Sequence, residues 1–258
     1  MLLARALCLP TSAGQQQRTS AMADTPEQHA PTLLLVGASR GIGLAMASAF
    51  VEKGWHIIGT VREDGRSGLH DLAETHPDQV TIEQLNITDP GQIAALRKKL
   101  ADRAYDMLFV NAGTANYDQD ETIAETSDEE FVRVMLTNAL GVMRTVEGFQ
   151  RLVQPSGLIG VMSSGQGSIA NNENGGHEVY RGSKAALNQY MRSYAARNAD
   201  DPRPLVLMAP GWIRTELGGP EATFSVEETI PELVDTLLAQ QGTPGLRFID
   251  RHGHTVPW

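Results

Sequence analysis

The sequence feature that most constrains the fold is a set of three glycines placed directly after a short apolar run. Leu33–Val36 are followed by Gly37, Gly41 and Gly43, and an apolar repeat with helical spacing starts within the same segment. Glycines let the backbone turn sharply, and the free N–H groups at a helix start attract an anion such as pyrophosphate. At a junction between strand and helix this pattern predicts a nucleotide-binding α/β fold, although a tight turn without a ligand would show the same glycines.

Short apolar runs alternate with helical patterns along the rest of the chain. Several runs show no alternation of polar and apolar residues, which is typical of strands covered on both faces. The regular β-α alternation predicts one doubly wound, Rossmann-type domain, whose seven-stranded sheet is mostly or wholly parallel and is flanked by helices. We expect strands at Thr32–Val36, His56–Val61, Val80–Leu85, Asp106–Val110, Leu158–Met162, Leu205–Ala209 and Leu246–Ile249.

Three helix starts are indicated by their first residues. Asp89 followed by Pro90 has the order of an N-cap and a first helical residue. A capping box, in which the first and fourth residues bond each other's backbone N–H groups, is predicted at Ser127/Glu130 and at Ser225/Glu228.

The bulk properties exclude several classes of protein. The 258 residues carry a formal net charge of −10, which argues against binding nucleic acid or an anionic membrane surface. Cys8 is the single cysteine and no apolar run is long enough to span a membrane, so we expect a cytoplasmic protein. Residues 1–31 are expected to be a disordered tail before a domain at 32–258. A transit-like leader, or a translation start at Met22, is the alternative for this segment.

Further motifs follow the later strands in order. They are Asn111-Ala112-Gly113, Asn138 in a helical segment, Ser164 at a strand end, Tyr180 with Lys184, and Pro210-Gly211. Together with the Gly-x-x-x-Gly-x-Gly spacing, these motifs resemble the short-chain dehydrogenase/reductase family over residues 32–258. The residues around 162–188 and the ending Pro257-Trp258 are similar to the carbonyl-reductase branch of that family.

The resemblance implies an oxidoreductase that uses NADPH to reduce the carbonyl group of an aldehyde or ketone. Tyr180 would donate a proton to the carbonyl oxygen, and Ser164 would hydrogen-bond the same oxygen. Lys184 would hold the nicotinamide ribose, and Asn138 would position a water between Lys184 and solvent. Because Tyr180 and Lys184 share one face of a helix, the ammonium, with the positive ring of the oxidised cofactor, is expected to lower the pKa of the phenol.

NADP(H) is the expected cofactor because the second strand ends at Arg62, where an enzyme that uses NAD would place an acid. Arg40 is a second cation for the 2′-phosphate, whereas Glu63 and Asp64 could hold a ribose instead. Asn86 is expected to contact the adenine. The expected cofactor-binding residues are Gly37, Ser39, Arg40, Gly41, Ile42, Gly43, Arg62, Asn86, Ile87, Asn111, Ala112, Gly113, Tyr180, Lys184, Pro210, Gly211, Trp212, Ile213 and Thr215.

Two details of the site stay open at this point. Ser164 lies sixteen residues before Tyr180, three more than is usual in the family, so spacing alone does not exclude Ser163 or Ser168. The glycine-containing segment 216–225 suggests a short, mobile roof over a small carbonyl substrate. No metal site is expected, since the close histidine pair at positions 252 and 254 has no third ligand in view.

The sequence also leaves alternatives for the oligomeric state and for the function of the protein. The long helices expected near 128–150 and 178–198 resemble those that pair subunits in the family, which predicts a homodimer or homotetramer. A sensor or signalling protein that binds NADP(H) with little turnover is the alternative function. A purely structural subunit is a third, which the complete catalytic set disfavours.

Overall fold

The structure is a computed structural model of the chain, and it describes residues 30–62 and 65–258. Residues 1–29 of the expected tail lie outside the described residues, as do Glu63 and Asp64. Within these ranges no helix is both long enough and apolar enough to cross a membrane.

Within the described residues, seven strands form one wholly parallel sheet in the order β3-β2-β1-β4-β5-β6-β7, which confirms the predicted Rossmann-type fold. The apolar runs predicted the strands to within one residue at nearly every end. The exception is β5, which starts five residues early because Val153 pairs with Tyr105 across a register shift. The strands are β1 Thr32–Val36, β2 His56–Val61, β3 Val80–Gln84, β4 Tyr105–Val110, β5 Val153–Met162, β6 Pro204–Ala209 and β7 Gly245–Asp250.

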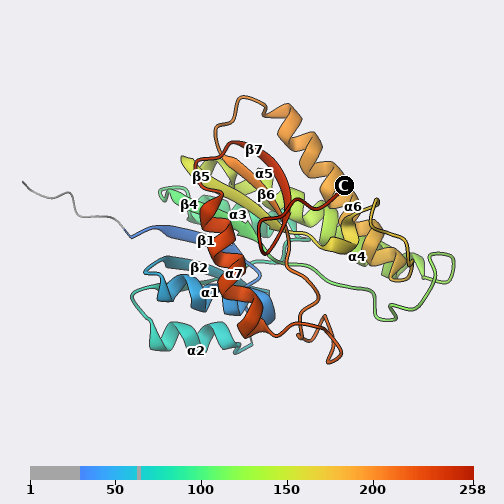
Figure 1. The fold of residues 1–258 in the computed structure, drawn as a ribbon. Helices are drawn as coiled ribbons and strands as arrows, with labels where there is room; N and C mark the ends of the chain where they lie inside the picture. Colours follow the sequence, from blue (N-terminus) through green and yellow to red (C-terminus); the bar gives the residue numbers. More distant parts are fainter. Residues whose placement is uncertain (1–29, 63–64) are drawn as a thin grey trace, which may run out of the picture.

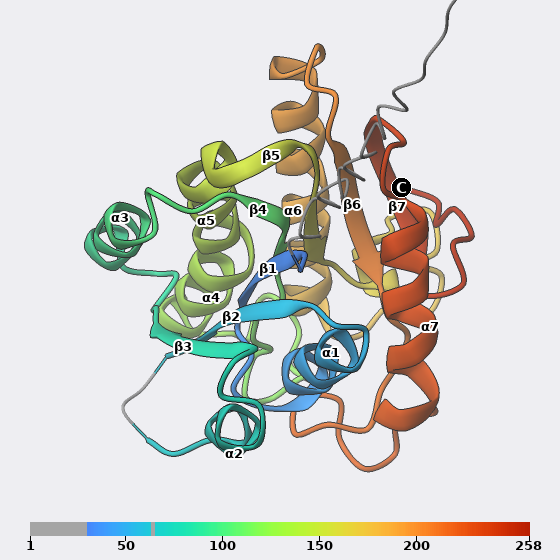
Figure 2. The same ribbon diagram turned by 90° about the vertical axis from the view of Figure 1, so that its left-hand side faces the viewer.

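Helices cover both faces of this sheet (Figures 1 and 2). One layer consists of α1 Gly41–Glu52, α2 Gly68–Thr75 and α7 Val226–Ala239, and the other of α3 Pro90–Lys99, α4 Asp128–Met135, α5 Val142–Phe149 and α6 Glu178–Arg197. In β1, Leu33 and Leu35 pack into the first layer, while Leu34 and Val36 pack into the second. Burial on both faces explains why the strands read as unbroken apolar runs.

The helix starts agree with the predictions, apart from one. The Asp89 carboxylate accepts hydrogen bonds from the N–H groups of Gly91 and Gln92, and the capping box at Ser225/Glu228 is complete. At Ser127 the hydroxyl accepts from the Glu130 N–H, but the predicted return bond is wrong. The Glu130 carboxylate instead accepts from the Tyr117 N–H, which the loop before α4 brings close, and from the Arg133 guanidinium one turn further along α4.

A π-helical turn, η1 Leu136–Gly141, joins α4 to α5. Such turns place one extra residue in the helix and occur often at functional sites. Asn138 lies in this turn and is fully buried.

Strands β1 and β4 are neighbours at the place where the strand order reverses. In doubly wound sheets, ligands bind in the crevice at the carboxyl ends of such strands. Gly37 follows β1 and Asn111 follows β4, so the candidate site lies at this edge of the sheet.

Candidate active site

The glycine loop between β1 and α1 requires glycine for close contact with β4. Gly37 has a φ of +87°, and a Cβ there would lie 2.8 Å from the backbone of Ala112. A Cβ at Gly43 would collide with the Gly37 carbonyl oxygen. That oxygen accepts a hydrogen bond of 2.8 Å from the Asn111 side-chain amide, which ties the loop to the end of β4.

The start of α1 is arranged to receive an anion. Arg40 occupies the N-cap position, and among the described residues no side chain caps this helix start. The first turn contains no acid, so its N–H groups and the positive end of the helix dipole face no protein carboxylate in that turn. Thr215 lies over the loop, with its methyl carbon 3.5 Å from where a Cβ of Gly41 would be. This cradle therefore fits a pyrophosphate.

Three residues expected to bind the adenosine part of the cofactor follow β1, β2 and β3, which are neighbours in the sheet. The Arg40 guanidinium forms an ion pair of 2.8 Å with Glu216. Arg62 is exposed at the end of β2, the strand next to β1. The Asn86 side-chain oxygen accepts hydrogen bonds from the N–H and hydroxyl of Thr88, which fixes its side chain beside the buried Ile87.

Ser164 and Tyr180 come together at the carboxyl ends of β5 and the first turn of α6. A hydrogen bond joins their side chains. The Lys184 ammonium lies 5.7 Å from the centre of the Tyr180 ring and donates a hydrogen bond of 2.9 Å to the Met162 carbonyl oxygen. The predicted helical spacing thus places phenol and ammonium on one face of α6, and the end of β5 adds the Ser164 hydroxyl to them.

The Asn138 side chain lies beside this group. Its oxygen accepts from the Thr114 N–H, and its amide nitrogen donates to the Thr114 carbonyl and to the Ser183 hydroxyl. A Cβ at Gly113 would lie 3.3 Å from the Asn138 oxygen and 3.4 Å from the Lys184 nitrogen. Gly113 therefore lies against both polar side chains, and a Cβ there would be in tight contact with them.

Burial changes the pKa values of both central groups. It raises the pKa of the Tyr180 phenol, and the hydrogen bond with Ser164 lowers it in part. Burial also lowers the pKa of Lys184 to about 8. For the chain alone, the predicted lowering of the Tyr180 pKa is wrong, because desolvation of the phenolate is the largest cause of the shift.

The structure favours Ser164 over the other two serines. The Ser163 hydroxyl is buried and donates to the Asn188 side-chain oxygen at 2.6 Å. Ser168 is also buried, and its hydroxyl accepts from the Asn171 N–H. Ser164 alone among the three is hydrogen-bonded to Tyr180.

Sequence reasoning missed the residues that hold the site in place. Thr114 and Ser183 each directly neighbour a motif residue, and together they satisfy the amide of Asn138. The Ser183 hydroxyl also donates to the Tyr180 carbonyl oxygen, so it links Asn138 to the first turn of α6. Arg251 packs on the Phe224 ring at 3.9 Å, below the Pro-Gly motif. Of these residues, only Thr114 and Ser183 could have been found from the sequence, because each is adjacent to a motif residue.

Backbone hydrogen bonds close the segment between β6 and α7 into a loop, and the mobility suggested by its glycines stays a prediction. It begins with Pro210 and Gly211. The N–H of Phe224 donates to the Trp212 carbonyl and the N–H of Arg214 to the Phe224 carbonyl, which closes the base of the loop. The Trp212 indole donates to the Gly218 carbonyl at 2.8 Å. A Cβ at Gly218 would collide with the Ile213 carbonyl oxygen, so close packing explains this glycine.

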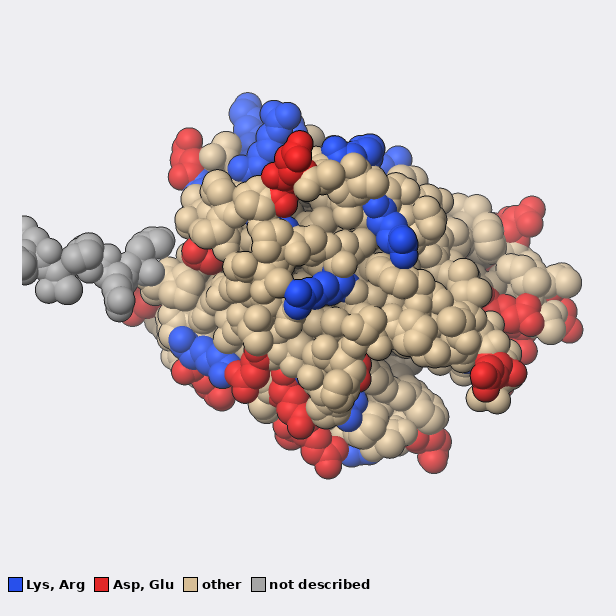
Figure 3. All heavy atoms as spheres, turned by 45° about the horizontal axis from the view of Figure 1, so that its top comes forward, with Lys and Arg blue, Asp and Glu red and all other residues tan. Residues whose placement is uncertain are grey.

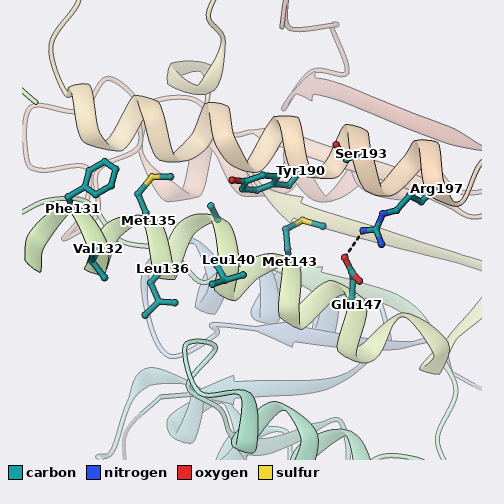
Figure 4. Close-up of a pocket in the computed structure, with 11 residues that line it drawn as sticks. Phe131, Val132, Met135, Leu136, Leu140, Met143, Glu147, Tyr190, Ser193 and Arg197 are labelled. Carbon is teal, nitrogen blue, oxygen red and sulfur yellow. Dashed lines mark hydrogen bonds and ion pairs between the residues drawn. The ribbon is translucent and has the colours of Figure 1, made fainter. Parts of the chain in front are cut away.

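A groove of about 520 Å³ runs along α4, η1, α5 and α6, outside the crevice (Figure 4). Its lining includes Phe131, Val132, Leu140 and Tyr190, four of the nine large apolar side chains exposed in the described residues. The ion pair between Glu147 and Arg197 closes one end. Elsewhere, Figure 3 shows a face where Lys and Arg are interspersed with Asp and Glu.

Comparison with known proteins identifies the family. A family model described as enoyl-(acyl carrier protein) reductase matches residues 37–234. A solved structure described as a short-chain dehydrogenase/reductase from Burkholderia multivorans with bound NADP is 58% identical, with a TM-score of 0.88. It covers 89% of this chain and 100% of its own. The chain belongs to the short-chain dehydrogenase/reductase family.

Other members of the family confirm the predicted branch. A carbonyl reductase from Pseudomonas aeruginosa PAO1 in complex with NADP is 34% identical, with a TM-score of 0.82, over 89% of this chain and 100% of that one. The C-signal protein of Myxococcus xanthus is 30% identical over 59% of this chain and 92% of its own length. The protein is thus an oxidoreductase of the short-chain dehydrogenase/reductase family.

Proposed function

We propose that this short-chain dehydrogenase/reductase reduces the carbonyl group of an aldehyde or ketone with NADPH. The observation that carries the proposal is the hydrogen-bonded pair Ser164–Tyr180 with the Lys184 ammonium 5.7 Å from the phenol ring. The likeness to a carbonyl reductase in complex with NADP supports it. When bound, NADPH would supply a hydride to the carbonyl carbon.

Tyr180 would donate its phenolic proton to the carbonyl oxygen. Its raised pKa keeps the phenol protonated at neutral pH, which is the state that a proton donor needs. Ser164 would donate a hydrogen bond to the same oxygen, where negative charge develops. One proton and one hydride convert the carbonyl to an alcohol, and Tyr180 is then reprotonated.

Lys184 and Asn138 would serve that reprotonation. Lys184 has a pKa of about 8, so its ammonium can give up a proton at modest cost near neutral pH. Asn138 uses both amide hydrogens on Thr114 and Ser183. Only its oxygen therefore retains a lone pair for a water that joins Lys184 to solvent. Lys184 would also hold the nicotinamide ribose.

The glycine loop would bind the cofactor pyrophosphate, and Arg40 with Arg62 would bind the 2′-phosphate. The uncapped start of α1 fits the first of these roles. Asn86 and Ile87 would border the adenine, while Gly113 and residues 210–215 would border the nicotinamide. Two solved relatives with bound NADP support this choice of cofactor.

We also propose a homodimer built on the groove along α4, α5 and α6. The second copy would cover Leu140 and Tyr190, which are 44% and 47% exposed. The Glu147–Arg197 ion pair lies at one end of the groove, at the edge of the face that the second copy would cover. A cytoplasmic location remains the expectation from the sequence.

The proposal is tested by following NADPH absorbance with the full chain and a panel of neutral aldehydes and ketones. A 2-enoyl thioester belongs in the panel because the matching family model is described as an enoyl reductase. We expect turnover of aldehydes or ketones, with the alcohol detected as product. Tight NADPH binding without turnover of any carbonyl would contradict the proposal and favour a sensor.

A further inference from the structure

The loop between β6 and α7 is joined to the glycine loop by one ion pair. Glu216 lies 2.8 Å from the Arg40 guanidinium, and the side chains of Arg40 and Glu216 are 70% and 72% exposed. Thr215, the preceding residue, contacts the position above Gly41. The carboxylate is therefore bound to the same cation that would receive the 2′-phosphate of the cofactor.

We propose that Glu216 is a specificity-determining residue, which lowers the affinity for the 2′-phosphate by competing with it for Arg40. This inference rests on the placement of that phosphate at Arg40 under the proposed function. The competition affects NADPH but not NADH, because NADH carries no 2′-phosphate.

The charges of the two anions explain why we expect the phosphate and Glu216 to compete for Arg40 instead of binding it together. A phosphate monoester carries a charge of roughly −1.5 to −2 at pH 7, so a carboxylate on the same guanidinium repels it. An exposed ion pair contributes little to stability, and a phosphate forms stronger charge-assisted hydrogen bonds with arginine. The phosphate should therefore displace the Glu216 carboxylate from Arg40. When NADPH binds, the loop between β6 and α7 then loses this contact with the glycine loop.

The expected effect is modest and has a defined sign. Removing the charge of Glu216 should tighten binding of a 2′-phosphorylated nucleotide about two- to fivefold, the range of an exposed ion pair. The affinity for a nucleotide without the 2′-phosphate should not change. In a protein that lacks the Arg40 charge, the same substitution should have no effect.

Calorimetric titration with adenosine 2′,5′-bisphosphate and with 5′-AMP tests this on the full chain. The variants are Glu216→Gln, Arg40→Gln and the double variant, with Glu221→Gln as an exposed control from the same loop. We expect Glu216→Gln to tighten only the bisphosphate. We also expect the double variant to match Arg40→Gln, and Glu221→Gln to match the parent.

Three results would overturn the inference. Glu216→Gln could bind the bisphosphate with the affinity of the parent, or it could bind it more weakly. The third is that Glu216→Gln tightens binding of the bisphosphate even in the Arg40→Gln background. Weaker binding would mean that Arg40 bridges both anions. A parent that does not prefer the bisphosphate over 5′-AMP would instead refute the placement of the 2′-phosphate. Whether the protein reduces carbonyls is tested separately with the Tyr180 variant, so a failure of this inference leaves the proposed reaction standing.

Discussion

Replacing Lys184 with methionine should stabilise the folded chain at neutral pH while damaging its site. The Lys184 side chain is almost fully buried, at 3% exposed, and burial lowers its pKa from 10.5 to about 8. The unfolded chain therefore binds a proton at this residue more tightly than the folded chain does. Folding at pH 7 carries this electrostatic cost, and it disappears as pH rises through the unfolded value.

The pKa difference gives the size of the effect. At 1.36 kcal/mol per pH unit, the fall from 10.5 to about 8 corresponds to about 3 kcal/mol at pH 7. By pH 10 the folded lysine has lost its proton while most unfolded lysines still hold theirs, because pH 10 lies only slightly below 10.5, and about 1 kcal/mol of the cost remains. Loss of the hydrogen bond to the Met162 carbonyl offsets about 1 kcal/mol at either pH. The advantage of Lys184→Met over the parent should thus shrink by about 2 kcal/mol between pH 7 and pH 10.

Urea denaturation at pH 7 and pH 10, at one protein concentration, measures this difference in the free energy of unfolding. Lys98→Met, which removes an exposed lysine of α3, serves as the control and should show no such pH dependence. A Lys184→Met variant that is less stable than the parent at pH 7, with an equal deficit at pH 10, would refute the reasoning. It would mean that the ammonium is not desolvated.

Three further predictions concern other parts of the molecule. Asn111→Ala should lower the free energy of unfolding by about 1–3 kcal/mol in urea denaturation, because it leaves the Gly37 carbonyl without its donor; an unchanged stability would contradict this. Ser164→Ala should lower kcat about 10²- to 10³-fold in the carbonyl assay, because it removes a hydrogen-bond donor to the developing oxyanion. Ser163→Ala is the control and should leave kcat nearly unchanged, whereas a loss of kcat in Ser163→Ala alone would assign the role to Ser163. Leu140→Arg should shift sedimentation from dimer to monomer, while the equally exposed Leu217→Arg should not; a dimer in both variants would place the interface elsewhere.

The fold could be predicted largely from the sequence because its strands are buried on both faces. Such strands appear as unbroken apolar runs, and β1 and β2 were located residue for residue. Helix α2 was missed, because its segment has few apolar residues and its capping box pairs Ser67 with His70 instead of a glutamate. The π turn that holds Asn138 was missed too, since nothing in the composition of residues 136–141 distinguishes it from an α-helix.

The site was predictable where it depends on motifs, and less so where it depends on contacts between distant segments. The spacing of Tyr180 and Lys184 follows from helical geometry, so their proximity could be predicted. The Lys184 bond to the Met162 carbonyl and the Glu216 bond to Arg40 depend on how separate loops fold. For the chain alone, the direction of the Tyr180 pKa shift was wrong because spacing reveals a neighbouring charge but not the degree of burial.

The central claim is that Tyr180 donates the proton in carbonyl reduction, and the variant Tyr180→Phe tests it most directly. Tyr190→Phe, which changes an exposed tyrosine of the same helix, is the matched control. General acid catalysis contributes about 10²- to 10⁴-fold, so kcat of NADPH-dependent reduction should fall by that factor in Tyr180→Phe alone, with the Kd for NADPH within a few-fold of the parent. A Tyr180→Phe variant that keeps the kcat of the parent would contradict the account.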